Sequence, residues 1–279
     1  MANLDAAAAG YITLGGDLRV PRLGFGAMHL TGEGVWGPSR DPAAARGLLK
    51  RAVQLGVRFI DTADSYGPAV SEEIIAEALH PYASDLVIAT KGGIVRPDRP
   101  TWAPEGRPGH LRAACEASLR RLRVDRIDLY QLHTIDPRVP LEESVGELAR
   151  LQQEGKIRHV GVSNFDVDQL ARARRIVPIV SVQNRYNVAD RAADDVLDIC
   201  TRDGIAFIPW RPLALASADA ARPARRRLDE AAAQRGWSVP QAALAWLLAR
   251  SPVMLPIPGT SSEAHLDELI AASALRLRD

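Results

Sequence analysis

The stretch that decides the fold runs from residue 57 to residue 91 and reads VRFIDTADSYGPAVSEEIIAEALHPYASDLVIATK. Two short apolar runs with β-branched residues, Val57–Thr62 and Leu86–Lys91, lie on either side of a longer segment, 71–79, whose apolar spacing is that of an amphipathic helix. A strand, a helix and a second strand in this order form a β-α-β unit. The pattern therefore predicts two parallel strands joined by a helix.

The same alternation repeats along the rest of the chain. Further strands are expected at Leu23–Ala27, Ile127–His133, Ile157–Ser163, Ile179–Gln183, Ile205–Trp210 and Val253–Pro258. Helical patterns follow near 41–55, 107–122, 141–154, 166–175, 192–202, 225–251 and 263–272. Eight strands, each followed by a helix and without a linker-like segment between halves, predict an α/β fold: a single (β/α)8 TIM barrel over residues 1–279.

Two segments carry additional signals. Residues Tyr11–Val20 have the pattern of a β-hairpin with Gly15-Gly16-Asp17 at its turn, and we expect this hairpin to plug the N-terminal bottom of the barrel. The long helical region 225–251 is expected to be two helices, because Pro240 follows an N-cap-like Ser238 and restarts the pattern.

Composition excludes several classes of protein. The chain is 47% hydrophobic and 25% charged, which is typical of a globular protein. Its 35 Lys and Arg residues balance 34 Asp and Glu residues, so no basic surface for nucleic acid is expected. Two cysteines, Cys115 and Cys200, have neither metal-ligand spacing nor a disulfide pattern. With no apolar run of the roughly 18 residues that a membrane span needs, we expect a cytoplasmic protein without a metal.

Four polar residues occur where the predicted strands end. Asp61 and Tyr66 follow the second strand, Lys91 ends the third, and His133 ends the fourth. Taken singly, each has an ordinary structural interpretation as a turn cap, a wall residue or a hydrogen-bonded side chain. Lys91 is unusual, because the chain has only two other lysines and uses arginine elsewhere. Since barrel active sites form at the carboxyl ends of the strands, these residues are expected to share one site.

Several segments, in this order, resemble the aldo-keto reductase family. They cover nearly the whole chain: Gly24–Gly26, Phe59–Gly67, Thr90-Lys91, Leu132-His133, Gly161–Phe165, Val182–Asn187 and Pro256–Thr260. The resemblance implies a catalytic tetrad in which Tyr66 is the general acid in reduction. Lys91 would lower the pKa of the Tyr66 phenol, Asp61 would keep Lys91 charged, and His133 would orient the substrate oxygen.

The resemblance also implies a nicotinamide cofactor, NADPH with NADH as the alternative, because no side chain can deliver a hydride. Polar groups of Ser163, Asn164 and Gln183 would hold the carboxamide, and Trp210 would stack on the ring. The wider cofactor site would include Gly26, Ala27, Met28, Asp61, Arg211, Pro212, Leu213, Ile257, Gly259, Thr260, Ser261, His265 and Glu268. Two of these depart from the family pattern: Arg211 replaces a small hydroxyl residue, and His265 stands where many relatives have arginine.

The activity expected from the resemblance is reduction of an aldehyde or ketone, a small-molecule carbonyl, to an alcohol, with pyridoxal worth testing. Trp36 and Trp102 are expected to contact substrate together with Tyr66 and His133. A monomer or weak homo-oligomer is expected. Two alternatives remain: a nucleotide-binding regulatory protein similar to potassium-channel β subunits, and a barrel enzyme in which Lys91 forms a Schiff base.

Overall fold

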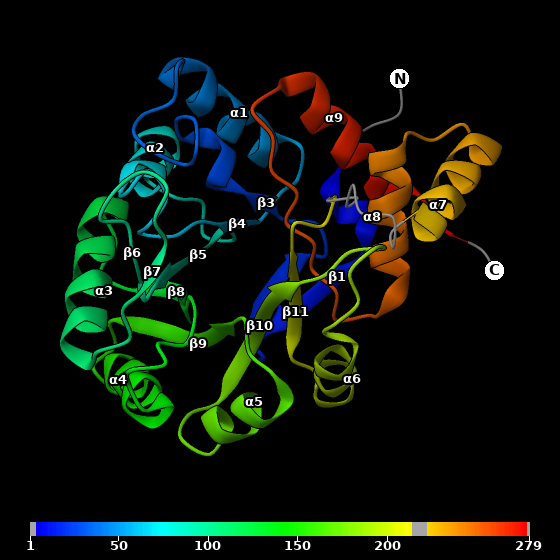
Figure 1. Cartoon of the computed structure of the whole chain (residues 1–279). Helices are drawn as coiled ribbons and strands as arrows, with labels where there is room; N and C mark the ends of the chain where they lie inside the picture. Colours follow the sequence, from blue (N-terminus) through cyan, green and yellow to red (C-terminus); the bar gives the residue numbers. More distant parts are fainter. Residues whose placement is uncertain (1–3, 214–221, 278–279) are drawn as a thin grey trace.

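The computed structural model describes residues 4–213 and 222–277, and a ring of strands lies at its centre with helices outside (Figure 1). Within those residues, seven strands form one sheet in the order β11-β10-β9-β8-β5-β4-β3, and all neighbouring pairs are parallel. The strands are β3 (Phe25–Gly26), β4 (Phe59–Asp61), β5 (Val87–Gly92), β8 (Ile127–Leu132), β9 (Ile157–Ser163), β10 (Ile179–Arg185) and β11 (Ala206–Trp210). The predicted α/β barrel is confirmed.

The segment predicted as the eighth strand, Val253–Pro258, closes the ring but is not a regular strand. Leu255 donates its backbone N–H to the Phe207 carbonyl of β11 at 2.8 Å. On the other side, Gly26 of β3 donates to the Pro258 carbonyl at 3.2 Å. Because the two prolines of the segment have no N–H, they accept hydrogen bonds but cannot complete a ladder.

The helices lie outside the strands (Figure 1), and all except α7 bury apolar residues in the main core of the barrel, whereas α7 packs against α8. In α1, for example, the buried residues follow helical spacing. The helices are α1 (Pro42–Gln54), α2 (Val70–Leu79), α3 (Pro108–Leu122), α4 (Leu141–Gln153), α5 (Val167–Arg174), α6 (Asp194–Asp203), α7 (Arg222–Arg235), α8 (Val239–Arg250) and α9 (Glu263–Ala271). Short 3-10 turns are η1 (Ala6–Ala9), η2 (Ala27–Leu30) and η4 (Ala272–Ala274).

The predicted division of residues 225–251 into two helices is confirmed. Ser238 caps α8 with a reciprocal capping box, in which its hydroxyl accepts from the Gln241 N–H and the Gln241 side chain accepts from the Ser238 N–H. Over the part of the chain that the structure describes, no helix is both long and apolar enough to cross a membrane.

The predicted N-terminal hairpin consists of β1 (Tyr11–Leu14) and β2 (Leu18–Pro21), paired antiparallel. Asp17 at its turn contacts His159 near the beginning of β9, with 2.6 Å between Oδ1 and Nε2. Gly15 has a φ of +60°, and a Cβ there would lie 2.2 Å from the His159 ring. The hairpin therefore lies against the N-terminal ends of the strands, as predicted.

The opposite end of the barrel carries the polar residues. Parallel register places Lys91 of β5 beside Gln131 of β8, and Ser163 of β9 beside Gln183 of β10. After β5 the chain makes a small antiparallel pair, β6 (Ile94–Val95) with β7 (Ala103–Pro104). This end combines converging strand ends with longer loops, which is where a barrel builds a site.

Candidate active site

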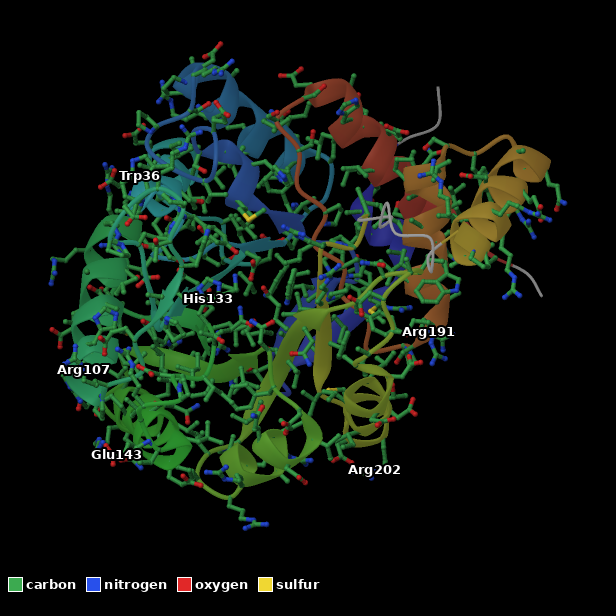
Figure 2. All side chains as sticks on the ribbon, viewed as in Figure 1. Trp36, Arg107, His133, Glu143, Arg191 and Arg202 are labelled. Carbon is green, nitrogen blue, oxygen red and sulfur yellow. The ribbon has the colours of Figure 1, made fainter. Side chains whose placement is uncertain are left out.

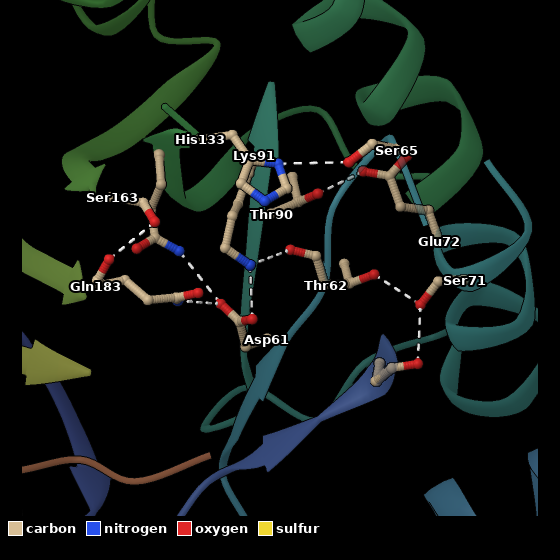
Figure 3. A network of polar contacts seen from close by, with 12 residues as sticks. Asp61, Thr62, Ser65, Ser71, Glu72, Thr90, Lys91, His133, Ser163 and Gln183 are labelled. Carbon is tan, nitrogen blue, oxygen red and sulfur yellow. Dashed lines mark hydrogen bonds and ion pairs between the residues drawn. The ribbon is translucent and has the colours of Figure 1, made fainter. Parts of the chain in front are cut away.

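An ion pair lies at the centre of the strand ends. The Lys91 Nζ atom is 2.6 Å from the Asp61 Oδ1 atom and also donates to the Thr62 carbonyl at 2.8 Å (Figure 3). The side chain of Lys91 is 0% exposed and that of Asp61 is 2% exposed. A group this deeply buried requires a partner, and each of these two residues supplies one for the other.

The second carboxylate oxygen of Asp61 accepts hydrogen bonds from two amides. Gln183 Nε2 lies 2.8 Å from Oδ2 (Figure 3). Gln131 Nε2 lies 3.2 Å from the same oxygen. Both carboxylate oxygens are therefore engaged, and the orientation of Asp61 is fixed. Gln183, expected from the resemblance to hold a carboxamide, thus donates a hydrogen bond to the Asp61 carboxylate through its amide nitrogen.

The surroundings of Lys91 favour a charged amine. Burial is the largest single influence and lowers the pKa of Lys91, but the charges and hydrogen bonds of Asp61 and Tyr66 together outweigh it, so the pKa lies above its ordinary value. A Schiff-base lysine needs a neutral amine at working pH. The pairing with Asp61 therefore argues against the Schiff-base alternative.

Tyr66 follows β4 and lies over Lys91, with 5.3 Å between Nζ and the centre of the phenol ring. Burial raises the pKa of the Tyr66 phenol, and the Lys91 charge opposes this rise without cancelling it. Lys91 therefore acts on the phenol in the expected direction, and burial of the phenol outweighs it. The phenol is consequently held as a neutral proton donor.

His133 comes directly after β8 and lies inside the ring of helices, whereas Arg107 and Glu143 lie at its outer edge (Figure 2). Its ring centre is 6.0 Å from that of Tyr66, and its Nδ1 atom is 3.3 Å from the Ser65 hydroxyl. Burial, followed by the charge of Lys91, lowers the pKa of His133 well below its ordinary value. The imidazole is therefore neutral at neutral pH and can both donate and accept a hydrogen bond.

A cavity of about 90 Å³ adjoins this tetrad. Most of its walls come from residues predicted to hold the cofactor. It is lined by Gly26, Met28, His29, Asp61, Tyr66, Gln183, Trp210, Arg211, Pro212, Ile257 and Gly259. The sequence interpretation missed His29, although it directly follows Met28 in the loop after β3.

Trp210, at the end of β11, is hydrogen-bonded to the side chain of Asn164, which follows β9. Its indole Nε1 donates to the Asn164 Oδ1 at 2.9 Å, and the Asn164 amide donates to the His133 carbonyl at 3.1 Å. The Ser163 hydroxyl donates to the Gln183 carbonyl at 2.8 Å. Through Asn164, the indole is therefore linked to the backbone of His133.

Other predicted cofactor residues do not line this cavity. The side chains of Ala27 and Leu213 pack with the core. Ser261 lines a separate cavity of about 450 Å³ beside His29. Thr260 is buried in the segment before α9. On α9 itself, His265 is exposed and Glu268 is half-buried.

Trp36 and Trp102 both lie close to the Tyr66 loop. The ring of Trp102 is 6.3 Å from that of Tyr66 in an edge-on arrangement, and Trp36 pairs with Gly67, which follows Tyr66. Trp36 lies nearer the edge of the ring of helices than His133 does (Figure 2). Between the two indoles lies Arg96, a residue the sequence interpretation did not single out.

Among residues 4–213 and 222–277, no group of three or more His, Cys, Asp or Glu side chains is arranged to hold a metal ion. Both cysteines are buried, and burial raises the pKa of each thiol to about 12. Separately, the buried phenol of Tyr66, the amine of Lys91 and the imidazole of His133 are groups that can take part in acid–base chemistry.

Comparisons with known proteins agree with this geometry. The chain is 49% identical over 274 residues to an oxidoreductase of Schizosaccharomyces pombe, covering 98% of this chain and 88% of the relative. It is 45% identical over 274 residues to pyridoxine 4-dehydrogenase of Escherichia coli, covering 95% and 93%. The crystal structure of an aldo-keto reductase from Klebsiella pneumoniae in complex with NADPH matches with a TM-score of 0.80 and 27% identity, covering 96% and 90%. Residues 22–279 match the model of the aldo/keto reductase family, and the chain belongs to that family.

Proposed function

We propose that this protein reduces an aldehyde or ketone to an alcohol with NADPH, and that Tyr66 supplies the proton. The observation that carries this proposal is the buried Asp61–Lys91 pair beneath Tyr66, with a neutral His133 beside it. This arrangement supports a proton donor in Tyr66, a stabilising cation in Lys91 and an orienting imidazole in His133 at the barrel mouth. Those are the groups that carbonyl reduction requires.

The cavity beside the tetrad fits the nicotinamide end of such a cofactor. Its side is formed by the Trp210 indole, a flat surface suited to an aromatic ring, and Gln183 contributes an amide. The guanidinium carbons of Arg185 and Arg211 each lie 5.9 Å from the Trp210 ring centre, which brings positive charge to the same edge. Two Klebsiella relatives were crystallised with NADPH or NADP. A bound NADPH would supply the hydride that adds to the carbonyl carbon.

The chain's own residues would manage the proton. The Tyr66 hydroxyl would donate its proton to the carbonyl oxygen as negative charge develops there. The phenolate left behind would be stabilised by Lys91, which Asp61 keeps charged and in place. His133, with its lowered pKa, would donate a hydrogen bond to the substrate oxygen as a neutral group.

The substrate candidates follow from the walls of the site and from one relative. Trp36 and Trp102 beside Tyr66 suit a substrate with a flat ring. The E. coli relative is named for pyridoxine oxidation at position 4, and the reverse reaction would start from pyridoxal. Pyridoxal is therefore the first candidate, within the broader class of aromatic carbonyls. Cytoplasmic location and a monomeric or weakly associated state stay predictions.

The test is the loss of reduced-nicotinamide absorbance, with NADPH and with NADH, in the presence of pyridoxal, 4-nitrobenzaldehyde or methylglyoxal. We expect carbonyl-dependent oxidation of NADPH by the wild-type protein. Tyr66→Phe should lower kcat by about a thousandfold or more, since the proton donor is lost, while NADPH still binds. Turnover at the wild-type rate in the Phe variant would exclude Tyr66 as the acid. Tight NADPH binding without turnover of any carbonyl would favour the regulatory alternative.

A further inference from the structure

Arg96 joins two loops at the mouth of the barrel. It follows β6, and only 8% of its surface is exposed. Its guanidinium donates to four backbone carbonyls, two in the loop after β3 and two in its own loop. The acceptors are Gly34 at 3.2 Å, Val35 at 3.0 Å, Thr101 at 2.9 Å, and Arg99. Because its N–H groups donate hydrogen bonds to four backbone carbonyls, this guanidinium is engaged by the protein itself and not by a ligand.

The same guanidinium lies between the two indoles that flank Tyr66. Its central carbon is 3.8 Å from the ring centre of Trp102 and 5.4 Å from that of Trp36. Trp102 is 39% exposed, so more than a third of its surface is open to solvent. A cation stacked on an indole face is an attractive contact, and here it orders two aromatic rings at once.

The backbone that Arg96 holds is strained. Val35 has a φ of +57°, a conformation that β-branched residues rarely adopt. The Val35 carbonyl accepts from Arg96 and also from the Gly67 N–H at 3.3 Å. Strained backbone of this kind persists only where surrounding contacts hold it in place. The hydrogen bond from Arg96 is one of the two contacts made to this carbonyl.

This turn is connected directly to the proton donor. Gly67, which follows Tyr66, donates to Val35 and accepts from the Gly37 N–H at 2.7 Å. The other indole, Trp102, meets the Tyr66 ring edge-on at 6.3 Å. Both loops held by Arg96 therefore end against the residue that faces the substrate carbonyl.

We propose that Arg96 is a positioning residue for substrate specificity: it holds Trp36 and Trp102 as an aromatic wall beside Tyr66. The wall selects carbonyl compounds in which the carbonyl is attached to a flat ring, over small aliphatic dicarbonyls. This inference rests on the proposed reductase function. Arg96 touches neither the reacting atoms nor the tetrad, so its effect acts through the two indoles.

Arg96→Lys tests the geometry rather than the charge. Lysine keeps the positive charge but has three donors on a single nitrogen, so it cannot span carbonyls of both loops as the planar guanidinium does. Arg99→Ala is the matched control, because Arg99 lies in the same loop, is about half exposed, and pairs only loosely with Glu33 at 3.4 Å. Its backbone carbonyl, which Arg96 uses, remains in the variant.

The measurement is kcat and KM for 4-nitrobenzaldehyde and for methylglyoxal with saturating NADPH. In Arg96→Lys, we expect KM for 4-nitrobenzaldehyde to rise about tenfold or more, while kcat/KM for methylglyoxal changes less than about threefold. Arg99→Ala should match the wild type for both substrates. Loss of equal size for both substrates, or an unchanged KM for the aromatic aldehyde, would overturn the proposal.

A binding experiment separates this inference from the reductase function. If the wild type turns over neither carbonyl, the proposed reaction fails, and calorimetric titration of NADP⁺-loaded protein with 4-nitrobenzaldehyde still tests the wall. Weakening of about tenfold or more in Arg96→Lys, with wild-type affinity in Arg99→Ala, supports the role of Arg96. Equal affinity in wild type and Arg96→Lys, or no binding to the wild type, overturns it.

Discussion

Two carboxyl groups three residues apart, Asp61 and Asp64, follow the same strand and have different environments. Asp61 pairs with Lys91 at 2.6 Å and accepts two amide hydrogen bonds. Asp64 is partly buried, and its enclosed Oδ1 has no hydrogen-bond partner among the described residues. Burial, followed by the charge of Glu72, raises the pKa of Asp64 to about 8. Partners, and not enclosure alone, decide whether a carboxyl near this site carries charge.

The two acids belong to two clusters of polar side chains, and the clusters differ in whether the acid has a cation beside it. The Lys91 cluster contains Asp61, Lys91, Gln131 and Gln183. The α2 cluster contains Asp64, Glu72, Thr90 and Arg121. In the α2 cluster, Glu72 forms an ion pair with Arg121, with 2.6 Å between Oε2 and Nε. It also accepts a hydrogen bond from the Thr90 hydroxyl at 2.5 Å (Figure 3). Asp64 is left without a direct cation, which is why the neutral form is favoured there.

The largest expected effect is on kcat, and it should distinguish the role of Lys91 from that of Arg121. Lys91→Met should lower kcat by about a thousandfold, because the phenolate of Tyr66 loses its stabilising charge. Arg121→Gln should leave kcat within about fivefold but destabilise the fold by about 3 kcal/mol, because buried Glu72 loses its partner. Steady-state kinetics and urea unfolding of both variants give the comparison. A large loss of kcat in folded Arg121→Gln would mean that the α2 cluster also takes part in catalysis.

A smaller effect concerns Asp64 and pH. The unfolded chain releases this proton near pH 4, whereas the folded chain keeps it until about pH 8. Between these values the folded state binds more protons, so the free energy of unfolding should fall as pH rises and level off above about pH 8. Asp64→Asn removes this titration. The variant should therefore gain stability relative to wild type between about pH 5 and about pH 9, on the order of a few kcal/mol.

Urea unfolding of wild type and Asp64→Asn at both pH values gives this measurement. Titrating groups that do not interact with Asp64 contribute equally to both proteins and cancel in the difference. The same dependence of stability on pH in the two proteins would contradict the assignment of a neutral Asp64.

The smallest effect sharpens the description of the Lys91 cluster. Gln131 donates to Asp61 over 3.2 Å, a longer bond than the 2.8 Å bond from Gln183. Gln131→Met keeps the volume of the side chain and removes only this bond, so kcat should fall about threefold and NADPH affinity should not change. A fall as large as that of Lys91→Met would show that Gln131 is indispensable for holding Asp61.

Much of the fold could be predicted because its signals are local. The alternation of apolar runs and amphipathic segments gave the parallel strands, and Ser238 with Pro240 gave the start of α8. The closing segment Val253–Pro258 was predicted as a regular strand, but in the structure it is irregular. Its apolar residues have the pattern of a strand, but two prolines remove the donors that a ladder requires.

The tetrad was predicted for a different reason. Asp61, Tyr66, Lys91 and His133 were placed together by the rule that barrel strands end at one mouth and by family resemblance. The structure brings these four residues together. It also places Arg96, His29 and Asp64 nearby, which no local pattern indicated, because their contacts come from loops and helices distant in the sequence.

The sequence by itself determined the barrel, the hairpin beneath it and the set of polar residues at its mouth, since periodicity and turn residues act over a few positions. Only the tertiary structure decided that Asp61 is paired and Asp64 is not. The donors to Asp61 are 30, 70 and 122 residues away along the chain. Likewise, the net rise in the pKa of Tyr66 depends on how deeply the folded chain buries the phenol. Long-range contacts and burial set these charges, and neither is encoded in the local pattern.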